Sequence, residues 1–91
     1  MNKALKKADI ERYALDAMRT ADVLPEENWK EFMGAAVSAG LSLQMIAEAL
    51  PCAPSTVSRW HSGKSVPPQF SRGPMKDVLI RLAAKRLGLD S

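Results

Sequence analysis

A polar face built around one arginine carries the clearest chemistry in this sequence. Four residues at i, i+3, i+4 and i+7 share one side of a helix: Ser55, Ser58, Arg59 and Ser62. An arginine guanidinium can donate two hydrogen bonds to guanine in the major groove of duplex DNA, or it can hold a phosphate. Serine hydroxyls can donate to bases or to phosphates, although a serine can also serve only as a helix-start or small surface residue. We interpret this face as a candidate DNA contact.

The helix that carries this face has a recognisable start and a recognisable inner side. Pro54 suits the first helical position, where its missing N–H costs nothing. Val57 and Trp60 stand three residues apart and face inward, away from the serines and the arginine. We expect this helix at about 54–61.

A first short helix is expected just before it, at about 42–50. Ser42 can cap its start, and Pro51 stops it because proline removes a backbone donor and clashes with the preceding turn. Its apolar positions recur on one face: Leu43, Ile46, Ala47 and Leu50. Two helices of this kind joined by a short turn form the pattern of a helix-turn-helix.

The segment resembles the helix-turn-helix of the lambda-repressor/Cro-like superfamily of bacterial and phage transcription regulators. The match covers the AGLS at 39–42, Ile46 with Ala47, Leu50, the run STVSRW at 55–60, the pair Gly63–Lys64 and Pro67. The resemblance implies an all-helical DNA-binding domain whose second helix enters the major groove. Two positions depart from the family pattern: Pro51 stands where many members have glycine, and Ala53 stands where a capping serine is common.

Three more residues join the candidate DNA contact. Thr56 is suited to a phosphate, and Lys64 follows the second helix and can contact the DNA backbone. Gln44 lies just inside the first helix, where a matching glutamine in the resembling family reaches a phosphate or braces a recognition side chain; an exposed helix former is the alternative. The full expected set is Gln44, Ser55, Thr56, Ser58, Arg59, Ser62 and Lys64.

Charge is distributed unevenly along the chain. Residues 1–50 hold six Lys/Arg against eight Asp/Glu, whereas residues 51–91 hold seven Lys/Arg against two Asp. A basic half that includes the second helix suits a phosphate-facing surface, and some five neutralised phosphates per subunit would give a log–log salt slope of about −4 to −5. A solvated basic face is the plainer alternative.

The rest of the chain is expected to complete one all-α domain, 1–91, a compact bundle of about five helices. Apolar periodicity and breaker residues predict the remaining helices at about 4–20, 25–40 and 74–87, with a loop over 63–73. The segment 1–22 is interpreted as a helix added to the DNA-binding unit and as a possible dimerisation element. Two apolar sets are candidates for a homodimer contact: Ile10, Tyr13 and Ala17, or Met75, Leu79 and Leu82.

Other function classes find little support in the sequence. His61 is the only histidine and Cys52 the only cysteine, so neither a metal-ligand cluster nor an internal disulfide is expected. No nucleophile–base pair or phosphate loop is visible, so we expect no enzyme, no cofactor and no small-molecule ligand. No apolar run approaches the ~18 residues of a membrane span, and the chain is expected to be cytoplasmic. The alternative to a DNA-binding regulator is a protein-interaction module, such as an antitoxin or a regulatory adaptor.

Overall fold

The computed structural model describes residues 6–89, and this range contains helices and no strand. The elements are α1 (Lys7–Thr20), the short 3-10 turn η1 (Glu26–Asn28), α2 (Trp29–Ser38), α3 (Leu43–Ala49), α4 (Pro54–Ser62) and α5 (Gln69–Arg86). The predicted all-α class with about five helices is confirmed. Residues 4 and 5 of the predicted first helix, 4–20, lie outside the described residues.

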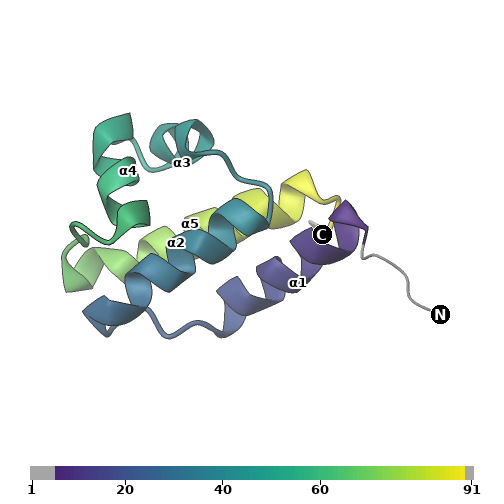
Figure 1. Ribbon diagram of the computed structural model, residues 1–91, viewed down its shortest axis with the longest axis horizontal. Helices are drawn as coiled ribbons and strands as arrows, with labels where there is room; N and C mark the ends of the chain where they lie inside the picture. The colour runs from purple at the N-terminus through teal and green to yellow at the C-terminus, as the bar shows by residue number, and fades with distance from the viewer. Residues whose placement is uncertain (1–5, 90–91) are drawn as a thin grey trace.

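The central element is α2. It lies between α1 on one side and the α3–α4 pair on the other, and it also contacts α5 (Figure 1). The long helix α5 additionally touches α1 and α3, so it ties both sides of the molecule together. This arrangement holds α3 and α4 against a scaffold of three longer helices.

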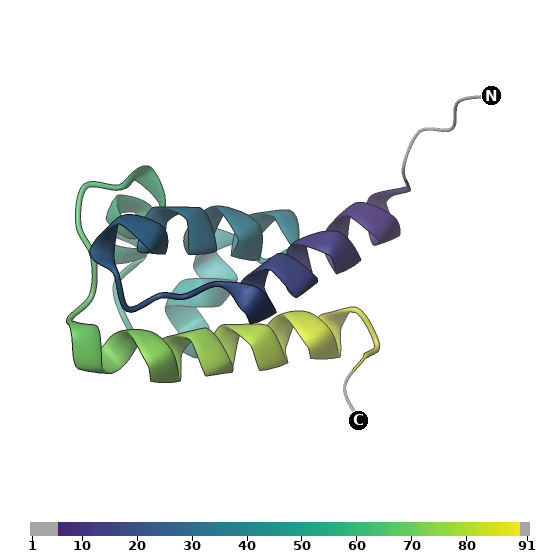
Figure 2. The ribbon, with the colours of Figure 1, turned by 90° about the horizontal axis from the view of Figure 1, so that it is seen from below.

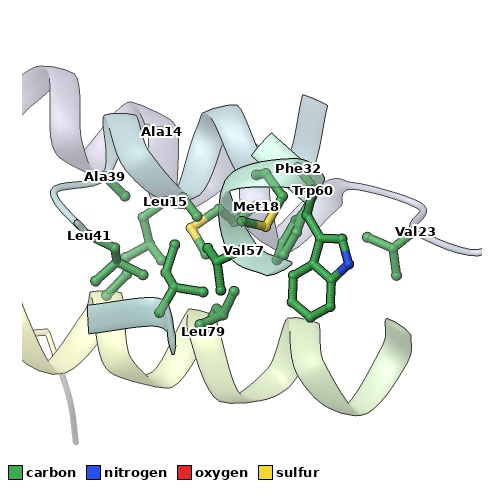
Figure 3. Packing of buried hydrophobic residues seen from close by; sticks show 14 of the residues in the cluster. Ala14, Leu15, Met18, Val23, Phe32, Ala39, Leu41, Val57, Trp60 and Leu79 are labelled. Carbon is green, nitrogen blue, oxygen red and sulfur yellow. The ribbon is translucent and has the colours of Figure 1, made fainter. Parts of the chain in front are cut away.

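The core is formed by one face of each helix. Figure 3 labels inward side chains from α1, α2, α4 and α5, together with residues of the connections. Its largest fully buried members are Trp29, Phe32, Leu15, Met18, Met33, Leu41, Ile46, Leu79 and Val57. Burial of such side chains contributes about 1.5–3 kcal/mol each relative to exposure, which makes this cluster the main source of stability.

The buried face of α1 differs from the apolar stripe that periodicity predicts for the helix at 4–20, which comprises Leu5, Ile10, Tyr13, Ala14, Ala17, Met18 and Ala21. Leu15, which the stripe omitted, is fully buried beside Met18. Ile10 and Tyr13, which the stripe included, are 45% and 79% exposed. The face of α1 that enters the core is the one that packs against α2 and α5, and it is rotated away from Tyr13.

The predicted loop over 63–73 and the predicted start of the last helix at Pro74 are wrong. Helix α5 begins at Gln69, after Pro68 as its N-cap, and Pro74 lies inside it. Pro74 lacks the N–H that would donate to the carbonyl of Phe70, which usually costs a helix several kcal/mol. The first turn is nevertheless helical because Arg72, within it, is anchored to other parts of the chain.

Arg72 is buried and donates hydrogen bonds to three backbone carbonyls. Its Nε donates to the oxygen of Val23 (2.7 Å), one terminal nitrogen donates to Pro67 (2.6 Å), and the other donates to Leu24. One turn later, Lys76 donates to the carbonyl of Ala21. In Figure 2 the connection that follows α1 runs along the N-terminal half of α5, where these contacts are made. The two cations thus fasten α5 to the end of α1.

The other end of α5 is held by an ion pair. Arg86 lies 3.3 Å from the largely buried carboxylate of Glu11 on α1. Both side chains pack over Gly40, which has a φ of +104°, and a Cβ placed there would lie against the Arg86 guanidinium and 2.9 Å from the Glu11 carboxylate. A residue without a side chain is therefore required at this position.

No single helix in residues 6–89 is long and apolar enough to cross a membrane. The segments Glu26–Ser38 and Leu43–Ala49, bent by 109°, reach the necessary length and composition only when taken together. The apolar side of the first segment is buried in the core described above.

Candidate nucleic-acid interface

Helix α3 begins and packs as its residues predict. The Ser42 Oγ accepts a hydrogen bond from the backbone N–H of Met45 (3.0 Å), which is the expected N-cap. Ile46 and Ala47 are buried, whereas Leu43 and Leu50 are half-buried at the edge of the core. The helix ends at Ala49, one residue before the predicted end.

The turn between α3 and α4 has no left-handed residue. Leu50 has a φ of −103°, and the positive-φ positions of residues 6–89 all lie elsewhere, at glycines. The turn is closed by a hydrogen bond from the N–H of Cys52 to the carbonyl of Ala47 (3.1 Å). Pro51, where the resembling family often has glycine, is therefore accommodated without a positive φ. Cys52 is half-buried here, and burial raises the pKa of its thiol.

Helix α4 starts on Pro54, as predicted, with Ala53 as an N-cap that offers no side-chain hydrogen bond. Its inner side is anchored by the buried Val57 and Trp60. The ring of Trp60 meets that of Trp29 edge to face, with centroids 6.0 Å apart, and Trp29 also contacts Phe32. Contacts of this geometry add to the area burial of the rings and fix the rotation of α4 about its own axis.

The outer side of α4 presents the predicted polar face to solvent. Ser55, Ser58, Arg59 and Ser62 are all exposed. The Ser62 hydroxyl donates to the carbonyl of Arg59 (3.2 Å), so part of its hydrogen-bonding capacity is used within the helix. Thr56 is only half-exposed and lies toward the edge of this face.

Gln44 lies on α3 and Lys64 follows α4, and both side chains are exposed. Gln44 Nε2 donates to a carboxylate oxygen of Glu48 on the same helix (3.4 Å). Glu48 was not part of the sequence-based site, and its negative charge makes the α3 side of the surface less favourable for phosphate. The α4 end beyond Arg59 is the more basic side.

Sequence reasoning missed one cation next to α4. Lys30 is exposed on α2, and its aliphatic stem packs against Gly63, where a Cβ would lie 2.9 Å from the Lys30 Cδ. Gly63 ends α4 in the left-handed conformation with a φ of +84°. The local sequence around Lys30 gives no signal of this contact, because the fold alone brings α2 to the end of α4. Lys30 and Lys64 therefore flank the same helix end.

The basic half of the chain offers fewer free cations than its composition suggests. Arg72 and Lys76 donate to backbone carbonyls, and Arg86 pairs with Glu11. Arg59 and Lys64 make no ion pair with any carboxylate of residues 6–89. The cations next to α4 that are available to phosphates are thus Arg59, Lys64 and Lys30.

Residues 6–89 contain no group of three or more His, Cys, Asp or Glu side chains placed to hold a metal ion. No family model matches this chain, and no curated protein or solved structure matches it. Its function has to be inferred from its own residues.

Proposed function

We propose that this chain is a sequence-specific DNA-binding transcription regulator of the repressor type, acting in the cytoplasm as a homodimer on a palindromic operator. One observation carries the proposal. The short helix α4 is locked to the core by Val57 and Trp60 on one side and presents Arg59 among serines on the other. A helix held rigidly at the surface with small polar residues and one arginine outward fits the major groove.

The mechanism follows from occupancy. Ser55 and Ser58 permit close approach of the helix to base edges, and Arg59 reads a guanine. Lys64 and Lys30, at the end of α4, hold phosphates and set the position of the helix on the duplex. A regulator bound over promoter elements excludes polymerase, and no cofactor is needed for this action.

Two subunits are proposed because one nine-residue helix contacts only a few base pairs, too few to select one site in a genome. A twofold axis places two such helices about one turn of DNA apart, ~34 Å. Of the two apolar sets considered for the contact, the one on α5 is unsuitable because Leu79 is fully buried. The set on α1 remains free.

The salt dependence of DNA affinity is the first test. Three cations beside α4 predict a slope of log affinity against log salt of about −3 per subunit, shallower than the −4 to −5 expected from composition. Titration of a labelled duplex at several salt concentrations measures it. A flat response, or no binding at low salt, contradicts the proposal.

The second test separates base reading from phosphate contact, on a site first obtained by selection from random duplexes. Arg59→Ala should weaken the selected site by about 1–3 kcal/mol and relax preference at one position in each half-site. Lys64→Ala is the matched control and should weaken all duplexes alike. If Arg59→Ala lowers affinity equally on every single-base variant, Arg59 contacts phosphate.

A protein-interaction module is the second candidate, and an apolar surface at the start of α5 favours it. Phe70 is 83% exposed there, beside Leu24 and Pro74. Soluble proteins often use exposed aromatic surfaces of this kind to bind partners. Failure of the selection to enrich any sequence, with the protein folded, would favour this function over DNA binding.

A further inference from the structure

The outward face of α1 is apolar and is not covered by any other described part of the chain. Ile10, Tyr13 and Ala17 share this face, and all three are exposed. Beside it a shallow groove runs between α1 and α2, whose walls include the small residues Ala35 and Ser38. The opposite face of α1 already fills the core, so this face is available to a partner.

One edge of this face carries charges of alternating sign. At about 100° per residue, four exposed side chains project within roughly 80° of one another along this edge: Asp9, Arg12, Asp16 and Arg19. Within the described chain they make a single ion pair, between Arg19 and Asp16 at 3.7 Å. Most of their charge is thus available to groups outside the chain.

The four charges alternate as acid, base, acid and base, so the same row read from its other end has a base wherever the first has an acid. In an antiparallel pair of α1 helices with a twofold axis beside Ala14, each residue faces the one equally far on the other side of position 14. Asp9 of one copy then faces Arg19 of the other, and Arg12 faces Asp16. A parallel pair would instead turn the charged edge of each helix toward the opposite edge of its partner, so these four charges would not meet one another. Only the antiparallel arrangement joins opposite charges throughout.

We infer that a second copy of this chain docks on the apolar face of α1, with the two α1 helices antiparallel and the axis beside Ala14. This inference rests on the proposed homodimer and specifies its interface. Tyr13 lies next to the axis, so the two tyrosine rings meet there, each over the groove of the other copy. Ile10 of one copy lies near the small Ala17 of the other.

The size of this interface sets the strength of the dimer. A helix of 14 residues is about 21 Å long, so the contact lies at the small end of specific interfaces. Exposed ion pairs add little each. The dimer should therefore form in the micromolar range, and the two half-sites of an operator should be bound cooperatively.

Charge reversal tests the register directly. Arg12→Glu and Asp16→Arg, made singly, each place like charges opposite one another twice in the dimer and should weaken self-association about tenfold or more. An equimolar mixture of the two variants restores both attractive contacts, and so does the double variant in one chain. Sedimentation equilibrium of each variant and of the mixture measures this, without DNA.

The controls keep the outcome clear. Lys85→Glu reverses an exposed charge on α5 and should leave self-association unchanged, and circular dichroism reports whether each variant keeps its helices. Tyr13→Glu, at the axis, should give a folded monomer. The weakest dimer expected has a dissociation constant on the order of 100 µM. If the unsubstituted chain stays monomeric at that concentration, the inference is overturned. The inference is also overturned if Arg12→Glu and Asp16→Arg are each folded and monomeric alone and their equimolar mixture stays monomeric as well. DNA binding is measured separately, and loss of it with an intact dimer would count against the proposed function alone.

Discussion

Arg72 should be the most important polar side chain for the stability of this domain. The residue is 3% exposed, and its guanidinium donates to three backbone carbonyls, on Val23, Leu24 and Pro67. These carbonyls belong to two separate connections, before η1 and before α5. Replacement by methionine keeps an unbranched side chain, shorter than that of arginine, and removes every donor.

The expected loss follows from the groups left behind. A hydrogen bond to a charged group is worth about 1.5–3 kcal/mol, and removing one partner from a buried charged network costs about 3–5 kcal/mol. A domain of 91 residues has a total stability of about 5–14 kcal/mol. Arg72→Met should therefore remove about 3–5 kcal/mol, a large part of the whole.

Urea unfolding followed by circular dichroism is the assay. With a slope of about 1 kcal/mol per molar, the midpoint should fall by roughly 3 M or more. Arg81→Met, which removes an exposed cation from the same helix, should change stability by no more than about 0.5 kcal/mol. If the two variants unfold within about 0.5 M of each other, the hydrogen bonds of Arg72 do not stabilise the fold as argued.

Three other predictions concern the backbone and the thiol. Ala53→Ser adds the missing cap to α4 and should stabilise the fold by about 0.5–1 kcal/mol in the same assay, whereas no gain would show that the capping N–H groups are already satisfied. Gly40→Ala should destabilise the fold by about 2 kcal/mol or more, because the φ of +104° at this position is strained for alanine and the added Cβ meets Arg86. Gly34→Ala, in the open middle of α2, should instead stabilise the fold by about 0.5–1 kcal/mol. Equal effects of the two variants would contradict the geometry. Because burial raises the pKa of the Cys52 thiol, the folded chain holds less thiolate at pH 8 than the unfolded chain does. Alkylation of Cys52 by iodoacetamide should therefore be slower in the folded chain and should accelerate in urea. Equal rates in the two states would contradict the burial of the thiol.

The elements that the sequence predicted well are those whose signals are local. The bounds of α3 and α4 agree with expectation to within a residue or so, because Ser42, Pro51 and Pro54 act within one turn of themselves. The burial of Val57 and Trp60 was likewise readable from their spacing. The exposure of the polar face of α4 follows from the same pattern.

The predictions that failed depended on distant partners. Whether the side of α1 that carries Tyr13 is buried depends on where α2 and α5 pack, and periodicity alone did not reveal this. The start of α5 depends on contacts from Arg72 to residues 48 and 49 positions away. Lys30 joins the candidate site only because α2 passes the end of α4. The count of charges along the chain overestimated the number of unpaired cations beside α4 for the same reason.

Helix α4 packs on the core with one side and faces solvent with the other, and this separation has an evolutionary consequence. The two residues that anchor the helix, Val57 and Trp60, lie on the side opposite to Ser55, Ser58 and Arg59. Substitutions on the outer side away from caps and networks usually change stability by no more than about 0.5 kcal/mol. A lineage carrying this fold can therefore acquire new outer residues one at a time while each intermediate still folds. If the chain reads DNA as proposed, divergence in its specificity would be limited by selection on the genes it regulates, and hardly at all by the stability of the domain.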